Sequence, residues 1–252
     1  MNQSEQTENQ LLKFSPGKGN AKLANLGSSG VVATFSLPSG WSCPSANECL
    51  SKAVQKGDGK WTIQDGKQTR FRCFSATQEV VYKAVREQRR HNFNLLLAAK
   101  TSDKMAALIE GSMPKAAAII RIHVGGDFFN QEYMHAWVKV AKKFPKTIFY
   151  AYTKSLNYWV ALKKEIPSNF KLNASKGGKH DSLIDQHKLK YAEVVFTEKE
   201  ARDKNLEIDH DDSHAFMQDK SFALLLHGVQ PKGSLASEAL KKLNGKGSYS
   251  KK

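Results

Sequence analysis

The chain has 252 residues, and its 39 Lys and Arg against 24 Asp and Glu give a formal net charge of +15 at pH 7. Its 40% hydrophobic content is ordinary for a globular protein and too high for a wholly disordered one. No apolar stretch approaches the roughly 18 residues of a spanning helix, and residues 1–10 lack the layout of a secretory signal. These features argue against a membrane, exported or repeat protein and predict a cytoplasmic one.

Composition divides the chain into three parts. Residues 1–29 are polar and rich in Gly, Ser and Asn, so we expect a flexible lead-in. Residues 244–252 are expected to form a disordered basic tail. A single α/β domain is predicted over residues 30–243, with a cysteine-bearing insertion over residues 41–75.

Strand and helix patterns alternate along this domain. A hairpin is expected around Trp61 and Ile63, then a long helix over residues 76–100 and a helix capped by Thr101 or Ser102. Beyond it, helices are expected over residues 130–144, 156–166, 198–204 and 234–243. The expected strands are residues 31–36, 116–124, 147–152, 170–174, 192–197 and 222–227. This alternation predicts a parallel sheet, either an open doubly wound sheet or a partial (β/α)6 relative of the TIM barrel.

The positive charge is carried mostly by lysine, with 39 − 7 = 32 lysines and seven arginines. Lysine suits backbone phosphates, so one reading is phosphate-dominated, weakly sequence-selective nucleic-acid binding. The other reading is a solubilising surface. Lys83, Arg86, Arg89 and Arg90 share one face of the predicted long helix, where they could contact phosphate or be solvated.

Three cysteines, Cys43, Cys49 and Cys73, lie close together in the chain, and no cysteine follows them. An odd number argues against a disulfide framework. Three readings stay open: a [4Fe–4S] cluster with one iron free for another ligand, zinc with His91 or His123 as a fourth ligand, or unligated core thiols.

Polar residues follow nearly every expected strand, at the edge where parallel α/β folds bind ligands. Gly125, Gly126 and Asp127 follow the second strand of the sheet, where two glycines allow close backbone approach. The alternative is a tight turn in which Asp127 caps the next helix. The other candidates at strand ends are His123, Tyr150, Tyr152, Thr153, Lys154, Asn173, Ser175, Thr197 and His227.

A second polar cluster spans residues 210–214, with the sequence HDDSH. It could supply metal ligands or acid–base groups, but an acidic surface loop is the favoured interpretation. With His123 and Asp127 it could form a metal-dependent nuclease site.

Several blocks resemble a family of phage and plasmid proteins named after mycobacteriophage gene product eighty-eight. The specific blocks are residues 121–129 (RIHVGGDFF) and 149–155 (FYAYTKS). Looser matches are residues 35–38, 42–44, 71–73 and 226–228, with Cys49, Tyr133 and Trp137.

That family's architecture looks similar to radical S-adenosylmethionine (SAM) enzymes, which implies a partial (β/α)6 barrel. The resemblance implies that Cys43, Cys49 and Cys73 hold a [4Fe–4S] cluster. It also implies that a Gly-Gly-Asp turn, Gly125 to Asp127, holds the amine of SAM. The usual C-x3-C-x2-C spacing of those enzymes is absent. Among the strand-end candidates, we expect Asn173 to contact the cofactor and Tyr152, Lys154 and His227 to orient the substrate.

The leading hypothesis is a phage-type [4Fe–4S] protein on a radical-SAM-like barrel that acts on or binds nucleic acid in the host cytoplasm. SAM is the second expected cofactor, with zinc as the alternative to the cluster. The alternatives are a non-catalytic nucleic-acid-binding protein with a structural metal and a metal-dependent nuclease. Oligomeric state is left open.

Overall fold

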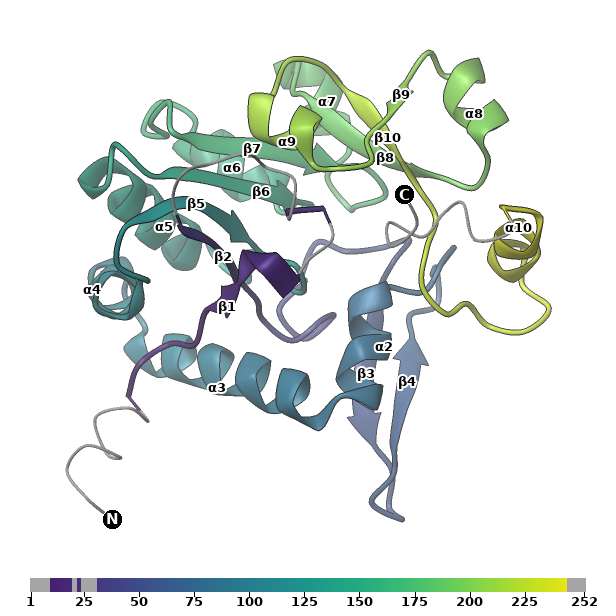
Figure 1. Ribbon diagram of the computed structural model, residues 1–252, viewed down its shortest axis with the longest axis horizontal. Coiled ribbons are helices and arrows are strands. Elements are labelled where there is room, and N and C mark those ends of the chain that lie inside the picture. Colours follow the sequence, from purple (N-terminus) through teal and green to yellow (C-terminus); the bar gives the residue numbers. More distant parts are fainter. Residues whose placement is uncertain (1–9, 20–21, 24–30, 244–252) are drawn as a thin grey trace.

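A computed structural model describes residues 10–19, 22–23 and 31–243, which form an eight-stranded, mostly parallel sheet with helices (Figure 1). In order across the sheet, the strands are β1 (Ser15–Pro16), β2 (Val31–Phe35), β5 (Ala117–Ile122), β6 (Ile148–Thr153), β7 (Phe170–Ser175), β8 (Tyr191–Val195), β10 (Phe222–Leu225) and β9 (Glu207–Ile208).

The six central strands lie side by side in chain order, and every neighbouring pair among them is parallel. The predicted parallel sheet is therefore confirmed. The doubly wound alternative is wrong, because the order of the six central strands never reverses at a switch point. Within the described residues the sheet does not close: β1, antiparallel to β2, forms one edge, and β9 forms the other.

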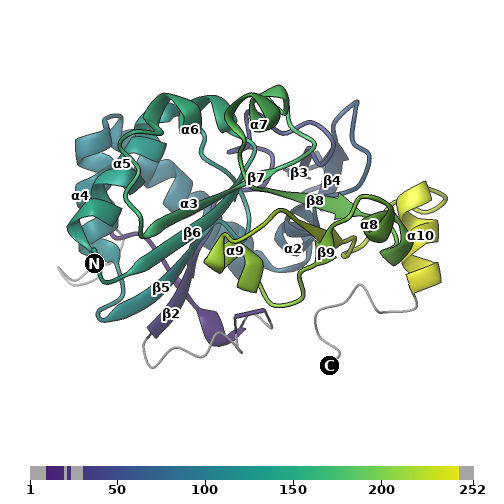
Figure 2. The same ribbon diagram turned by 90° about the horizontal axis from the view of Figure 1, so that it is seen from above.

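One face of this sheet is covered by helices, as the view from above shows (Figure 2). Alternate strand residues such as Phe35, Ile120 and Phe149 are fully buried there against the apolar face of α5 (Gln131–Lys143), where Tyr133 and Trp137 lie. The side chain of Asn130 accepts a hydrogen bond from the Tyr133 amide and caps α5. After β6, β7 and β8 come α6 (Leu156–Leu162), α7 (Ser182–His187) and α8 (Glu198–Asp203), and α4 (Ser102–Ser112) precedes β5.

The described residues of the lead-in pack against the rest of the domain. Leu12 is 4% exposed, and the ring of Phe14 lies 5.0 Å from that of Phe35. Lys13 donates its backbone N–H to the Asn92 side chain. Leu12 and Phe14, two apolar residues in an otherwise polar segment, indicate this packing in the sequence, because such side chains are buried when a core surface is within reach. Residues 1–9, 20–21, 24–30 and the predicted tail, 244–252, lie outside the described residues.

The predicted long helix is two helices, α2 (Phe74–Val81) and α3 (Lys83–Ala99), joined at Tyr82 in an extended conformation. Valine, valine and tyrosine in succession have low helix propensity, which favours a break there. The predicted hairpin is confirmed: β3 (Ser51–Gln55) pairs with β4 (Trp61–Asp65) and packs on α2.

Five short elements were not predicted by the sequence patterns. They are β1, α7, β9, the 3-10 helix η1 (Gly17–Gly19) and α9 (Ser213–Met217). Of these, η1 lies beside β2, and α9 lies over β6 and β7 on the face opposite α5. A final helix, α10 (Leu235–Leu243), closes the described chain, as expected. No described helix is both long and apolar enough to cross a membrane.

Candidate functional site

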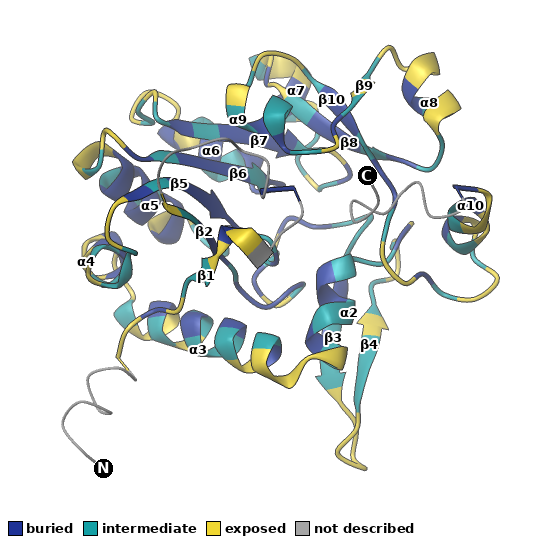
Figure 3. Ribbon diagram, viewed as in Figure 1, coloured by how far each residue is buried: buried dark blue, intermediate teal, exposed yellow. Residues whose placement is uncertain are grey.

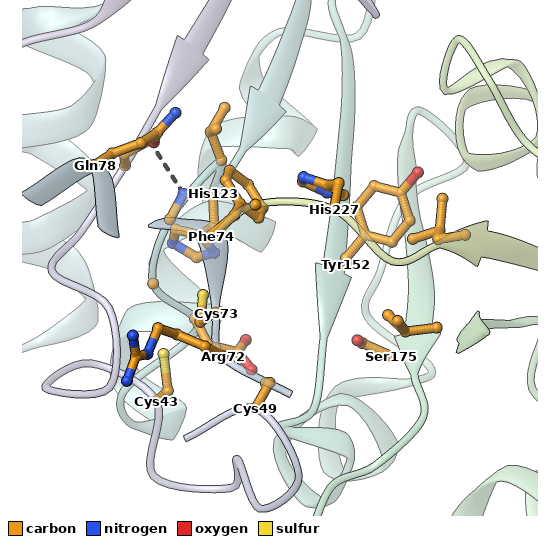
Figure 4. Close-up of a pocket in the computed structure, with 18 of the residues that line it drawn as sticks. Cys43, Cys49, Arg72, Cys73, Phe74, Gln78, His123, Tyr152, Ser175 and His227 are labelled. Atoms are coloured by element: carbon orange, nitrogen blue, oxygen red, sulfur yellow. Dashed lines mark hydrogen bonds between the residues drawn. The ribbon is translucent and has the colours of Figure 1, made fainter. Parts of the chain in front are cut away.

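A pocket of about 1020 Å³ lies at the carboxyl ends of the strands. It is lined by residues of β1 and β2 near one edge of the sheet and of β8 and β10 near the other. Its volume is at the upper end of what small-molecule sites occupy. The leading hypothesis assigns ten residues to the cluster, the cofactor or the substrate, and nine of them line this pocket. Figure 4 shows several of them around the cavity. The nine are Cys43, Cys49, Cys73, Gly125, Gly126, Asp127, Tyr152, Lys154 and His227.

The three cysteines reach this pocket from separate places in the insertion. Cys43 lies in the loop after β2, Cys49 lies just before β3, and Cys73 directly precedes α2. All three are free thiols. Each would interact electrostatically with the other two if charged, so the insertion brings all three thiols to the same part of the pocket, although not close enough together to hold one metal ion.

Burial raises the pKa of all three thiols, that of Cys49 to about 11. The positive charge of Lys154 acts to lower the pKa of Cys49. The backbone amides of Ser75 and Ala76, at the start of α2, act to lower the pKa of Cys73. The free thiols are therefore protonated near neutral pH, and a metal binding there must displace their protons.

The turn after β5 depends on two glycines. A Cβ on Gly125 would lie 2.0 Å from the Ser75 hydroxyl and 2.9 Å from the Arg89 guanidinium carbon. Gly126 has a φ of +89°, and a Cβ there would lie 2.6 Å from the Ser42 hydroxyl. The glycines thus let the turn pack against both α2 and the loop that carries Cys43.

Gly125→Ala is expected to lower the free energy of unfolding by several kcal/mol, on the order of the cost of overpacking a core. Gly111→Ala, in α4, is the matched control, because a Cβ there meets nothing within 4 Å and Ala is the better helix former. Urea denaturation measures both. Equal stability of the two variants would contradict the tight approach at Gly125.

Asp127 does not cap α5, which corrects the alternative considered above. Its carboxylate accepts from the Thr153 hydroxyl at 2.6 Å and from the amides of Lys154 and Phe128 at 2.8 and 2.7 Å. Burial raises the pKa of Asp127 to about 6, although these hydrogen bonds act in the opposite direction. Asp127 therefore ties the end of β5 to the end of β6 at the pocket wall.

Lys154 extends along the pocket wall to β7. Its Nζ donates to the carbonyl and hydroxyl of Ser175, at 2.9 and 3.0 Å, and to the carbonyl of Lys176 at 2.5 Å. The side chain is 6% exposed, so these neutral acceptors replace water around its charge. The result is a buried cation whose field reaches Cys49.

His123 lines the pocket, but its ring packs into the core beneath the sheet. A φ of +70° turns it away from the face that its neighbour Arg121 occupies. The ring lies 4.8 Å from that of Phe128, and its Nε2 is hydrogen-bonded to the Tyr133 hydroxyl at 3.0 Å. Burial lowers the pKa of His123 to about 3. It is therefore a neutral core histidine, and His91 contacts the carbonyl of Leu11 instead of the thiols.

The HDDSH segment is not a surface loop at Asp212, which corrects the favoured interpretation. Asp212 is fully buried and forms ion pairs with Lys22 at 2.9 Å and Arg121 at 2.7 Å. The hydroxyls of Tyr150 and Tyr152 each donate to it at 3.0 Å. Burial would raise the pKa of Asp212, but Arg121 and Lys22 outweigh it and hold the pKa at about 2.

The remaining predicted residues divide between pocket and core. The ring of His227 lies 4.5 Å from that of Phe74, and burial lowers its pKa to about 4, with Lys22 and Arg121 acting in the same direction. Asn173 does not line the pocket: it is fully buried and donates to the carbonyl of Ala215 in α9.

The arginines of α3 correct a further expectation. Arg86 and Arg89 are 9% and 5% exposed, so they are neither solvated nor placed to contact phosphate. Arg89 forms a 2.9 Å ion pair with Glu79 of α2 and also donates to Ser75. It thus fixes α2, and with it Cys73, against α3.

An apolar wall of the pocket was missed by the sequence reasoning. It lies on the side of β8, β10 and α10, opposite the Gly-Gly-Asp turn. The apolar run Leu224–Leu226 at the end of the last predicted strand could have revealed it, because all three residues line the pocket. Its members are Phe71, Phe74, Val194, Leu224, Leu226 and Leu240.

No three His, Cys, Asp or Glu side chains of the described residues are grouped so that they could hold a single metal ion. In particular, the structure does not assemble His123, Asp127 and residues 210–214 into such a group.

Residues 10–244 match the family described as Gene product 88. The chain belongs to this family. It is 31% identical over 153 residues to the Gene 88 protein of Mycobacterium phage D29, covering 57% of this chain and 56% of that one. It is also 31% identical over 135 residues to the Gene 88 protein of Mycobacterium phage L5, covering 50% and 48%. The matches thus span about half of each Gene 88 protein, and no solved structure matches the chain.

Proposed function

We propose that the protein binds a [4Fe–4S] cluster on Cys43, Cys49 and Cys73 and a second, non-protein ligand beside it. The observation that carries this proposal is the convergence of three free thiols on one large pocket. Three thiolates would leave one iron of a four-iron cluster open to that second ligand.

The electrostatics of the site bear on how the thiols could bind iron. Each thiolate of a cluster binds a different iron atom, so the ligands of a cluster stand farther apart than those around one ion. Lys154 and the amides at the start of α2 favour the charged form of the thiols that iron requires.

The second ligand is proposed to be SAM, held by the turn Gly125 to Asp127. Sequential parallel strands and an unclosed side are what a partial (β/α)6 barrel of the radical-SAM kind needs. The carboxylate of Asp127 is already occupied by Thr153 and backbone amides. Gly125 is buried, and its carbonyl accepts from the Leu37 amide, so the peptide groups of Gly126 would be the contacts. When bound, the cluster would supply one-electron reduction of the neighbouring ligand.

The proposed substrate is nucleic acid, and the +15 charge supports it. In this proposal Tyr152, Lys154 and His227 orient the substrate in the pocket. His227 is neutral at pH 7, since its pKa is about 4, and can therefore donate or accept a hydrogen bond without adding charge.

The proposal is tested by iron, zinc and acid-labile sulfide analysis of the anaerobically purified full chain, with an absorbance spectrum. The expected result is a brown protein with a broad band near about 400 nm and roughly four irons and four sulfides per chain. A change of the spectrum on adding SAM would support the second ligand. A colourless protein that stays free of iron and sulfide after anaerobic reconstitution would overturn the cluster.

A further inference from the structure

Five side chains outside the pocket alternate between cations and aromatic rings. The Lys52 Nζ lies 4.5 Å from the centroid of the Trp41 ring. The Arg90 guanidinium lies 5.9 Å from the Trp41 ring and 4.9 Å from the Trp61 ring. At the other end of this series, the Arg86 guanidinium lies 4.1 Å from the centroid of the Trp61 ring. We call these five residues the cation–aromatic ladder.

The ladder joins three parts of the chain. Trp41 follows β2, Lys52 and Trp61 lie on the β3–β4 hairpin, and the two arginines lie one turn apart on α3. Figure 1 shows this hairpin projecting beside α2 and the start of α3. The indole N–H of Trp41 donates to the carbonyl of Ala53 at 3.1 Å, which fixes the ring against the hairpin.

Trp41 is the most exposed member of the ladder. It is 47% exposed, Lys52, Arg90 and Trp61 are of intermediate exposure, and Arg86 is 9% exposed. Tryptophan is highly buried on average in folded proteins, so a half-exposed indole that is held in a fixed orientation is unusual. In Figure 3 the tip of the neighbouring hairpin is also exposed.

The charge of the ladder is not balanced. Lys52, Arg86 and Arg90 form no ion pair with a carboxylate among the residues that the structure describes. Arginines of the pocket differ in this respect, because each is paired: Arg72 with Asp65, Arg89 with Glu79 and Arg121 with Asp212. Lys52 and Arg90, two cations without a carboxylate partner beside the exposed Trp41 ring, attract an anion that also carries flat rings.

We propose that the cation–aromatic ladder is a binding surface for single-stranded nucleic acid, with a base stacked on Trp41 and phosphates contacting Lys52 and Arg90. Aromatic rings interleaved with cations are the elements of sequence-tolerant single-strand binding. The flexible stem of Lys52 allows its ammonium to move from the ring face to a phosphate. Paired strands keep their bases stacked inside the duplex, so they offer no base to Trp41.

The ladder also lies next to the pocket in the chain. Gly40 and Cys43, on either side of Trp41, both line the pocket. A nucleic-acid strand bound at Trp41 would therefore pass along the edge of the pocket, where the proposed function needs its substrate. This last step rests on that proposed function, whereas binding to the ladder does not require the cluster.

The test measures binding of fluorescein-labelled 20-nucleotide oligo-dT and oligo-U to the full chain by anisotropy, over a range of salt concentrations. Trp41→Ala is expected to weaken binding on the order of 10-fold, as the loss of one stacked base does. Trp41→Phe, which keeps a ring, is expected to weaken it less. Lys52→Ala is expected to reduce the slope of log affinity against log salt by about 1. Comparing the two oligonucleotides distinguishes DNA from RNA.

Two control variants separate this surface from general effects of charge and hydrophobicity. Leu235→Ala removes another exposed apolar side chain, and Lys164→Ala removes an exposed lysine after α6. Both are expected to bind as the unmodified chain does. Equal affinities for the ladder variants and the controls would overturn the ladder alone. Failure of the unmodified chain to bind either oligonucleotide would overturn the nucleic-acid partner as well, and iron analysis of the same sample would test the cluster independently.

Discussion

Replacing Cys49 with serine is expected to reduce the iron and sulfide content of the anaerobically purified protein to a small fraction of its original value. Serine has nearly the same size, but its hydroxyl is a much poorer ligand for iron than a thiolate. The triple variant with serine at Cys43, Cys49 and Cys73 is expected to bind no cluster. Iron and sulfide analysis and the absorbance near about 400 nm measure the loss.

Ser45→Ala is the control for this experiment, because Ser45 is a buried residue between Cys43 and Cys49. It is expected to keep its iron. Circular dichroism during heating shows whether each variant is folded. A folded triple variant with unchanged iron and sulfide would show that the cysteines are not the ligands.

Asp212→Asn is expected to lower the free energy of unfolding by about 3–5 kcal/mol, the usual cost of removing one partner from a buried ion pair. Lys22 and Arg121 would then remain in the interior without the carboxylate that balances their charge. Asparagine tolerates the left-handed backbone at this position, where φ is +61°, so the substitution tests the charge. Urea denaturation of the purified variant measures the change.

Asp203→Asn serves as the control, because Asp203 forms an exposed ion pair with Lys199 on α8. Such pairs contribute about 0–1 kcal/mol. The pKa of Asp212, about 2, is lower than the value of about 3.9 in an unfolded chain, so its stabilisation is present above pH 4. It is lost as the pH falls through 2. An Asp212→Asn variant no less stable than the control would contradict the buried ion pairs of Asp212 with Lys22 and Arg121.

The sequence predicted the parallel sheet because its signals are local. Each strand is a short apolar run, and each helix has its own periodicity and, at Asn130, its own cap. The pocket residues followed from one topological rule, that parallel strands end at the same edge of a sheet. This rule placed Tyr152, Lys154 and His227 around one cavity without knowledge of the loops.

The errors involve residues whose positions depend on distant partners. His123 leaves the alternation of β5 through a single positive φ, which no neighbouring residue type announces. Asp212 is buried because Arg121, 91 positions earlier, offers it a charge across the sheet. Arg86 is buried against Trp61 of the hairpin, and helix periodicity alone could not indicate that contact.

The position of the cysteine-bearing insertion also has a consequence for folding kinetics. It lies between β2 and β5, which are neighbours in the sheet although residues 36–116 separate them in the chain. Closing a longer loop costs little free energy, about 0.6 kcal/mol for each doubling of its length. Folding rates, however, fall as contacting residues become more distant in sequence. The strands from β5 to β8, joined by short connections, are therefore favoured to pair early, and the joining of β2, which completes the thiol-lined side of the pocket, is favoured to come late.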